Sequence, residues 1–291
     1  MAISIDDIPD DLIKDYLDGK CGFFVGAGLS RGAGFPDWKD LLLKMIDKAV
    51  ADRLLDEAAA KDCRTLSENS SKYLTLAGEL RDVLDADFKT VLEDVFTDPD
   101  IKPTDAHDTL VKLRKNNFVI TTNYDLLIEQ AFVNIRELQT SYKYYEANAI
   151  QRQLYQRHFF LLKAHGDAKS AANKIVLTDR DYRDLLYKEP GYQSVLQSIF
   201  TMYSVIFIGC SLDDPELRLL LNYINSAFPD GGIPHYALMS TNSTGEAERN
   251  RWKKDYNLRT ISISADNNYE DINTFLGILR EQEDAQGAAA S

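Results

Sequence analysis

Three groups of residues that could bind a ligand or do chemistry each follow a short apolar stretch of this sequence. Gly26-Ala27-Gly28 follows the first stretch, Asn123 and Asp125 follow the second, and His165 follows the third. Glycines after a strand let the backbone approach a pyrophosphate, and the N–H groups of a following helical turn can bind it. A neutral imidazole can remove a proton near pH 7. Phosphate binding and proton removal are therefore the chemistry that these residue types offer.

Each of these motifs also has a purely structural explanation. Taken alone, the glycines are equally compatible with a tight turn, and Asn123 and Asp125 with a helix cap. His165 alone is compatible with a buried histidine that is hydrogen-bonded to backbone. It is nevertheless the one histidine followed by glycine at the end of a predicted strand, unlike His107, His158 and His235.

The glycine loop does not match the dinucleotide fingerprint of dehydrogenases. After Gly26 and Gly28 the third glycine, Gly32, comes one position late. The fingerprint also needs a second strand that ends in an acidic residue about 20 residues further on. That region of the sequence is helical in pattern, so a dehydrogenase is disfavoured.

The elements that must position these motifs alternate between strands and helices. Apolar runs predict strands at 21–25, 118–121, 159–163, 174–177, 203–209, 235–239 and 259–263. Helical patterns predict helices at 10–18, 104–113, 126–132, 214–225, 244–255 and 269–282, and a further helix that begins after its cap, Thr178. This alternation predicts an α/β fold with a Rossmann-like, mostly parallel sheet flanked by helices. Such sheets bind ligands at the carboxyl ends of their strands, where every motif above falls.

A helical block interrupts this alternation near the N-terminus. Helical spacing of apolar residues predicts helices at 38–50, 52–60, 71–84 and 88–96. We expect one catalytic domain over residues 1–280, with a helical insertion at about 40–115. Residues 281–291 are polar and then small, which predicts a flexible tail.

Composition narrows the class of protein further. The chain has 291 residues, 44% of them hydrophobic, and a net charge of −13. An acidic surface repels phosphate backbones, so we expect no direct nucleic-acid binding. We also expect no membrane span and no secretory signal. Three scattered cysteines without a CxxC pair predict a cytoplasmic protein.

Residues 26–39 resemble the opening NAD motif of the sirtuin family. That motif reads Gly-Ala-Gly-x-Ser, three residues, and then Gly-hydrophobic-Pro-Asp-aromatic-basic. Here Ser30 completes its first part, and Pro36, Asp37 and Trp38 fall in its second part without a gap. Lys39 stands where the family usually has arginine.

Three further segments resemble sirtuin motifs in the family's order. Thr121–Asp125 resembles Thr-Gln-Asn-Ile-Asp, with Thr122 in place of the glutamine. Lys163–Gly166 resembles the segment with the catalytic histidine. Gly209–Leu212 resembles Gly-Thr-Ser-Leu, with Cys210 in place of the threonine.

The resemblance implies a role for each matching residue. NAD+ would be the substrate, with His165 as the base and Asn123 holding the ribose or the attacking water. Asp125 would bind the nicotinamide carboxamide. The other implied contacts are Gly26, Ala27, Gly28 and Ser30 at the phosphates, Pro36, Asp37 and Trp38 at the nicotinamide end, and Gly209 and Ser211 at the adenosine. The nicotinamide leaves as a neutral group, so no general acid is needed.

The absence of cysteine from 167–195 narrows the resemblance to one branch. Protein-deacylating sirtuins carry two zinc-binding CxxC pairs there, and a structural zinc needs about four ligands. We therefore expect no metal and no zinc ribbon. The chain instead resembles bacterial sirtuin-like proteins of anti-phage defence, which hydrolyse NAD+ to nicotinamide and ADP-ribose. Those proteins are oligomeric, and some assemble with DNA-translocating ATPases, so a homo-oligomer or such a partner is implied.

Two other functions remain open. One is a non-catalytic sensor that binds NAD+ or ADP-ribose and controls a partner. The other is a zinc-free deacylase or ADP-ribosyl transferase. A tyrosine-rich segment without clear period, 140–155, fits a lid, an interface or ordinary packing equally well.

Overall fold

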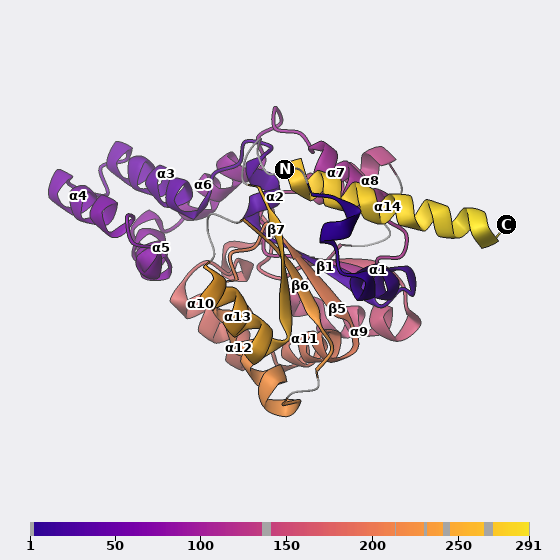
Figure 1. The fold of residues 1–291 in the computed structure, drawn as a ribbon. Coiled ribbons are helices and arrows are strands. Elements are labelled where there is room, and N and C mark those ends of the chain that lie inside the picture. Colours follow the sequence, from indigo (N-terminus) through magenta and orange to yellow (C-terminus); the bar gives the residue numbers. More distant parts are fainter. Residues whose placement is uncertain are drawn as a thin grey trace.

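Seven parallel strands form one sheet at the centre of the molecule (Figure 1). The computed structural model describes residues 3–135, 141–212, 214–229, 232–240, 245–264 and 270–290. The strand order is β3-β4-β2-β1-β5-β6-β7. The strands are β1 (Cys21–Val25), β2 (Phe118–Thr121), β3 (Ser141–Lys143), β4 (Phe160–Lys163), β5 (Ser204–Ile208), β6 (His235–Ser240) and β7 (Leu258–Ile263). The predicted α/β fold with a Rossmann-like parallel sheet is confirmed.

Helices cover both faces of the sheet because its strands are apolar on both faces. In β1, Phe23 and Val25 pack into one core and Phe24 into the other. The first core is shared with α1 (Asp10–Leu17), α2 (Ala27–Arg31), α7 (Asp105–Lys112), α8 (Leu127–Ile135) and α14 (Glu270–Ala290). The second is shared with α9 (Ala147–Gln156), α10 (Asp179–Lys188), α11 (Pro190–Met202), α12 (Pro215–Ala227) and α13 (Glu246–Tyr256).

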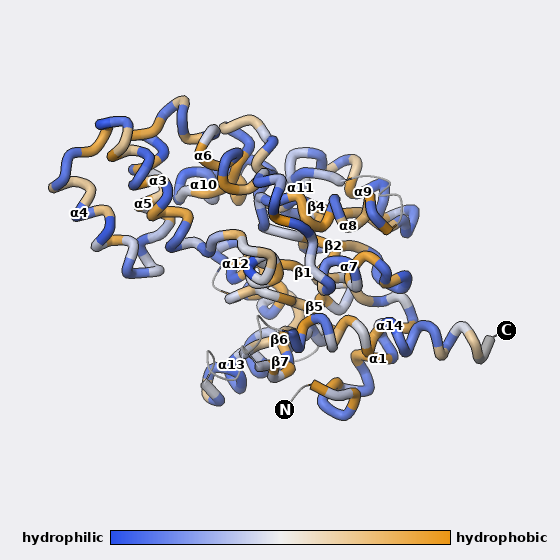
Figure 2. The backbone as a smooth tube through the Cα atoms, turned by 90° about the horizontal axis from the view of Figure 1, so that it is seen from above, coloured by the Kyte–Doolittle hydropathy of each residue, from blue (hydrophilic) through white to orange (hydrophobic). Residues whose placement is uncertain are grey.

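Four helices form a lobe that projects from one end of the sheet (Figures 1 and 2). They are α3 (Trp38–Ala51), α4 (Glu57–Leu66), α5 (Tyr73–Leu84) and α6 (Asp87–Phe96). Figure 2 shows the lobe opposite the C-terminal end of α14. The lobe has its own core, which continues into Tyr124, Leu127, Ala168 and Leu177 beside the sheet. The following helix, α7, packs on α8 and α14 instead, so the projecting part of the helical block is α3–α6.

The predicted strand at Lys174–Leu177 is wrong. The chain there forms a short 3-10 helix (Ala172–Lys174), and residues 175–177 belong to no strand. Ile175 and Leu177 pack in the core of the lobe, whereas Val176 packs in a core of the sheet. The apolar run therefore reflects burial of its residues in two different cores.

Other elements differ from the sequence-based expectation. Helix α4 begins at Glu57 rather than at residue 52, because Asp56 caps it by accepting from the Ala59 N–H at 2.8 Å. Within 140–155, the structure has β3, a 3-10 turn (Tyr144–Glu146) and α9, although Thr140 lies outside the described residues. Helix α11 was not predicted.

The last helix does not end at Gln282 as expected. Helix α14 continues to Ala290, and Glu283, inside the predicted tail, is buried. Its carboxylate accepts hydrogen bonds from the Tyr16 hydroxyl and the backbone N–H groups of Arg114 and Lys115. Thr244, Tyr269 and Ser291, which bound predicted segments, lie outside the described residues. Among the described helices, none combines the length and apolarity needed to cross a membrane.

Candidate active site

A pocket lies at the carboxyl ends of the central strands, between the sheet and the helical lobe. Its lining comprises Ala27, Ser30, Phe35, Pro36, Asp37, Trp38, Leu41, Phe96, Thr122, Asn123, Tyr124, Asp125, His165, Tyr182 and Asp214. Eight residues predicted from sequence are thereby brought together: Ala27, Ser30, Pro36, Asp37, Trp38, Asn123, Asp125 and His165. Gly26, Gly28, Gly209 and Ser211 are outside this lining.

The glycines at the ends of β1 and β5 let two loops touch. The Gly28 N–H donates to the Gly209 carbonyl at 2.9 Å. A Cβ on Gly26 would lie 2.5 Å from the Gly209 carbonyl oxygen. A Cβ on Gly209, whose φ is +64°, would lie 2.5 Å from the Leu29 nitrogen. Glycine at these positions is therefore required for loop packing, whatever ligand the loops bind.

Residues beyond Gly209 differ in exposure. Ser211 is exposed. The Cys210 thiol contacts the Phe24 and Ile208 carbonyl oxygens, and burial raises its pKa. A thiol that stays protonated is no nucleophile, so Cys210 acts as a small packing residue.

Asn123 connects the end of β2 to the loop after β1. Its Nδ2 donates to the Gly26 carbonyl at 3.1 Å and to the Ser30 hydroxyl at 3.0 Å. Its buried Oδ1 has no hydrogen-bond partner among the described residues. Asn123 therefore holds the glycine loop with one end of its amide and offers a free acceptor at the pocket with the other.

Asp125 caps a helix and also lines the pocket. Its Oδ1 accepts from the Leu127 N–H at 3.0 Å, which begins α8. Its carbonyl accepts from the buried Lys163 ammonium at 2.5 Å, and Lys163 also pairs with Glu129 at 3.6 Å. Asp125 thus caps α8 and also lines the pocket. Sequence reasoning missed Lys163 as a support of this corner, although a lysine ending a buried strand was the available signal.

The nicotinamide end implied by the sequence includes Asp37 and Trp38, at the start of α3. Asp37 caps α3 by accepting from the Asp40 N–H at 3.0 Å, and its carboxylate lies 3.7 Å from the Arg31 guanidinium. The Trp38 ring stacks on Tyr73 with centroids 6.2 Å apart. Lys39 pairs with Glu68 in the lobe at 2.6 Å and lines no part of the pocket.

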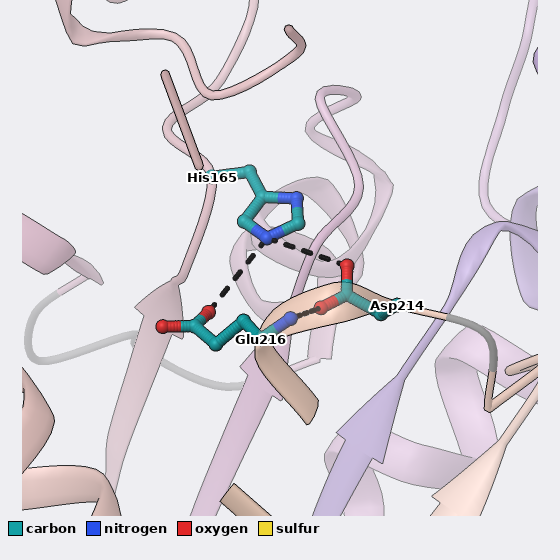
Figure 3. Close-up of side chains that lie close together, drawn as sticks. All are labelled: His165, Asp214 and Glu216. Carbon is teal, nitrogen blue, oxygen red and sulfur yellow. Dashed lines mark hydrogen bonds and ion pairs between the residues drawn. The ribbon is translucent and has the colours of Figure 1, made fainter. Parts of the chain in front are cut away.

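His165 follows β4 and points its imidazole at two carboxylates (Figure 3). Its Nε2 lies 3.7 Å from Asp214 Oδ2 and 3.8 Å from Glu216 Oε2, beyond hydrogen-bond length. Burial alone lowers the pKa of His165, but Glu216 and Asp214 more than offset this, and the pKa lies above its usual value. Gly166 has φ +74°, and a Cβ there would lie 2.6 Å from the Lys174 carbonyl oxygen. The glycine is therefore what allows the chain to turn after the histidine.

Asp214 and Glu216 were missed as functional residues. Both belong to the start of α12: Asp214 caps it, and Glu216 is its second residue. The Tyr182 hydroxyl donates to Asp214 Oδ2 at 2.6 Å, and the Tyr192 hydroxyl donates to Glu216 Oε2 at 3.1 Å. Burial raises the pKa of Glu216, whereas His165 lowers it. The sequence signal that could have found both residues was their position. They follow β5 at the carboxyl end of the sheet, where His165 also follows β4.

The other histidines are not part of the pocket lining. His107 and His235 are buried, and burial lowers the pKa of each to about 4. His158 is exposed.

Comparisons with known proteins identify related sequences. A family model described as a SIR2-like domain matches residues 117–261. The Defense-associated sirtuin 2 of Bacillus subtilis is 26% identical over 92% of this chain and 26% of its own length. The NAD(+) hydrolase ThsA of Acinetobacter baumannii (strain 532279) is 27% identical over 79% of this chain and 44% of its own length. That of Bacillus cereus (strain MSX-D12) is 25% identical over 91% of this chain and 55% of its own length.

The chain thus spans between about a quarter and just over half the length of these curated relatives. Among solved structures, Sir2Tm bound to a propionylated peptide aligns over 94% of this chain and 98% of its own, with a TM-score of 0.47 and 14% identity. The family model matches the segment that carries Asn123 and His165, so residues 117–261 of this chain are similar to a SIR2-like domain.

Proposed function

We propose that this chain is an NAD+ hydrolase domain that cleaves NAD+ to nicotinamide and ADP-ribose. The observation that carries this proposal is the convergence of Ser30, Asn123 and His165 on one pocket from the ends of β1, β2 and β4. Several relatives are named NAD(+) hydrolase, which supports the same activity.

The chemistry of the bond fits these residues. The nicotinamide leaves without needing a proton, so the site must stabilise a positively charged ribose and deliver a nucleophile. The free Oδ1 of Asn123 can accept a hydrogen bond from a ribose hydroxyl or from the attacking water. His165 in its neutral form can take the proton that the nucleophile loses.

The negative charge around the pocket suits a cationic substrate. Asp125 and Asp214 both line it, beside Asp37. Carboxylates near a nicotinamide ring favour its cationic form on binding and stabilise the charge that moves to the ribose as the bond breaks. Asp125 is the residue that we assign to the nicotinamide carboxamide.

We further propose that this activity depletes cellular NAD+ in bacterial anti-phage defence. The name of the Bacillus subtilis relative, a defence-associated sirtuin, supports that setting. By the resemblance to sirtuin-like defence proteins, the active form would be a homo-oligomer or a complex with a partner such as a DNA-translocating ATPase. We propose that this activity takes place in the cytoplasm, because the NAD+ pool to be depleted is there.

Nicotinamide release tests the activity. The chain, alone and with the product of the neighbouring gene, is incubated with NAD+, and nicotinamide is quantified. We expect His165→Ala and Asn123→Ala each to lower the rate by about two to four orders of magnitude. The matched controls His158→Ala and Asn250→Ala replace exposed residues and should keep the wild-type rate.

The proposal fails if wild type releases no nicotinamide under either condition, or if both site variants match their controls. Calorimetry that shows NAD+ binding without consumption would identify the sensor alternative. Transfer of label from NAD+ to protein would identify the transferase.

A further inference from the structure

The donor atoms of His165, Asp214 and Glu216 face a common point. Each residue offers one ligand atom, and the three atoms lie within 4.8 Å of one another. Figure 3 shows His165 Nε2 directed between the two carboxylates. Donors around a tetrahedral zinc ion sit about 3.4 Å apart, given bond lengths near 2.0–2.1 Å. The observed 3.7 and 3.8 Å from Nε2 to the two oxygens are close to that spacing.

The cluster holds a buried imidazole nitrogen that lacks a hydrogen-bond partner among the described residues. His165 is 2% exposed and Glu216 is 4% exposed. His165 Nε2 accepts or donates no hydrogen bond within the described part of the chain. Among the described residues, no basic side chain other than His165 lies within ion-pair distance of either carboxylate. Two closely spaced carboxylates therefore need a proton on the imidazole, a proton on one of the carboxylates, or another cation.

Outer contacts hold both carboxylates in place. Tyr182 donates to Asp214 and Tyr192 to Glu216, and the Gln193 amide donates to Glu216 Oε1 at 2.9 Å. Asp214 Oδ1 is fixed by the backbone N–H groups of Glu216 and Leu217. Hydrogen bonds of this kind orient metal ligands and strengthen their affinity.

We propose that His165, Asp214 and Glu216 form a binding site for a divalent first-row transition-metal ion. One imidazole and two carboxylates suit Zn²⁺, Mn²⁺ or Fe²⁺ rather than a thiolate-preferring ion. Asp214 and His165 line the pocket, whereas Glu216 is not part of its lining. The pocket is thus the entry path for the ion.

Metal binding and the proposed role of His165 as a general base exclude each other. A metal ion bound to His165 Nε2 takes the lone pair that would otherwise accept a proton. Bound metal therefore inhibits NAD+ hydrolysis, and a chelator restores it. This consequence rests on the proposed function, whereas metal binding itself does not.

Binding is measured without NAD+, so that it is tested even if the hydrolase proposal fails. Calorimetry with ZnCl2 on the full wild-type chain should show one equivalent bound. With CoCl2, we expect visible absorption bands of nitrogen and oxygen ligands, without the intense near-ultraviolet band of a thiolate. Glu216→Gln and Asp214→Asn should each weaken binding by at least about tenfold, and Tyr192→Phe by about tenfold.

Controls separate this site from other metal-binding groups. Asp214→Asn retains the helix cap, because asparagine caps as well as aspartate. Thermal melts show whether each variant is folded. His158→Ala and Cys63→Ser, which lie outside the cluster, should bind as wild type does.

The site is disproved if wild type binds neither ion stoichiometrically. It is equally disproved if binding survives both carboxylate variants, or is lost in Cys63→Ser. In a chain that proves active, added ZnCl2 should inhibit wild type, and EDTA should reverse the inhibition.

Discussion

At the scale of single residues, Asp125 has two roles that one substitution can separate. Its carboxylate caps α8 and also lines the pocket. Asp125→Asn keeps an acceptor for the Leu127 N–H but removes the charge. We expect a change in the free energy of unfolding below about 0.5 kcal/mol, and a fall of at least about tenfold in kcat/KM for NAD+ hydrolysis.

Denaturant unfolding and steady-state kinetics measure the two effects separately. Asp125→Ala is the matched comparison, because it removes the cap as well and should cost about 1 kcal/mol. Wild-type kinetics in Asp125→Asn would show that the charge has no part in the reaction.

Gly166 is a second residue with a definite backbone requirement. Its positive φ and the nearby Lys174 carbonyl oxygen leave no room for a side chain. Gly166→Ala should lower the free energy of unfolding by about 1–3 kcal/mol and displace the adjacent His165. The measurement is denaturant unfolding together with nicotinamide release.

Gly78→Ala is the matched control for that substitution. Gly78 lies inside α5, and a Cβ there would meet Thr178 at an ordinary 3.9 Å. Alanine should stabilise that helix by about 0.5–1 kcal/mol. Equal destabilisation by both substitutions would contradict the special role of Gly166.

The site residues differ in how far sequence could locate them. Three parts of the site were predicted: Asn123, His165 and the loop that contains Ser30. Each lies next to a strand end and within a recognisable local motif. Asp214 and Glu216 were not, because a cap and a first-turn acid are ordinary features of helix starts. Their proximity to His165 depends on β5 and β4 ending at one edge of a folded sheet, which no local pattern encodes.

At the scale of elements, strands that are buried on both faces were the most predictable. Residues 21–25, 118–121 and 204–208 are continuous apolar or small runs, which is how parallel strands are expected to look. β3 was missed because it has three residues at the sheet edge. Helix α11 was missed although Tyr192, Leu196 and Ile199 follow helical spacing.

The continuation of α14 gives a prediction about truncation. A chain ending at residue 280 loses the Glu283 carboxylate, which accepts from Tyr16, Arg114 and Lys115. Hydrogen bonds to a charged group contribute about 1.5–3 kcal/mol each, so we expect a loss of at least about 2 kcal/mol in the free energy of unfolding.

A chain ending at residue 287 is the control, since it keeps Glu283. It should unfold like the full chain in denaturant. If the chain ending at residue 280 also unfolds like the full chain, residues 281–291 act as the flexible tail that the sequence suggested.

At the scale of the whole molecule, buried histidines make stability depend on pH. Burial lowers the pKa of His235 from 6.5 to about 4, so the folded protein keeps this residue neutral. Between pH 6.5 and 4 the unfolded chain binds a proton that the folded chain does not. The free energy of unfolding therefore falls as pH falls through this window, by up to about 1.4 kcal/mol per pH unit for one such group.

His235→Asn tests this dependence. Asparagine keeps an acceptor for the Val205 N–H, which His235 Nδ1 accepts at 3.2 Å, but it does not titrate. We expect a shallower loss of stability between pH 6.5 and 5, measured by denaturant unfolding at several pH values. The exposed control His158→Asn should keep the wild-type slope, and an unchanged slope in His235→Asn would contradict the assignment.

The helical lobe and the pocket share side chains. Phe35, Leu41 and Phe96 belong to the core of the lobe and also form a wall of the pocket. A close-packed core transmits a change of volume to its neighbours. A substitution that changes side-chain volume between α3 and α6 would thus change the shape of the pocket without contacting a bound substrate. A molecule that binds the outer surface of the lobe could change the shape of the pocket in the same way.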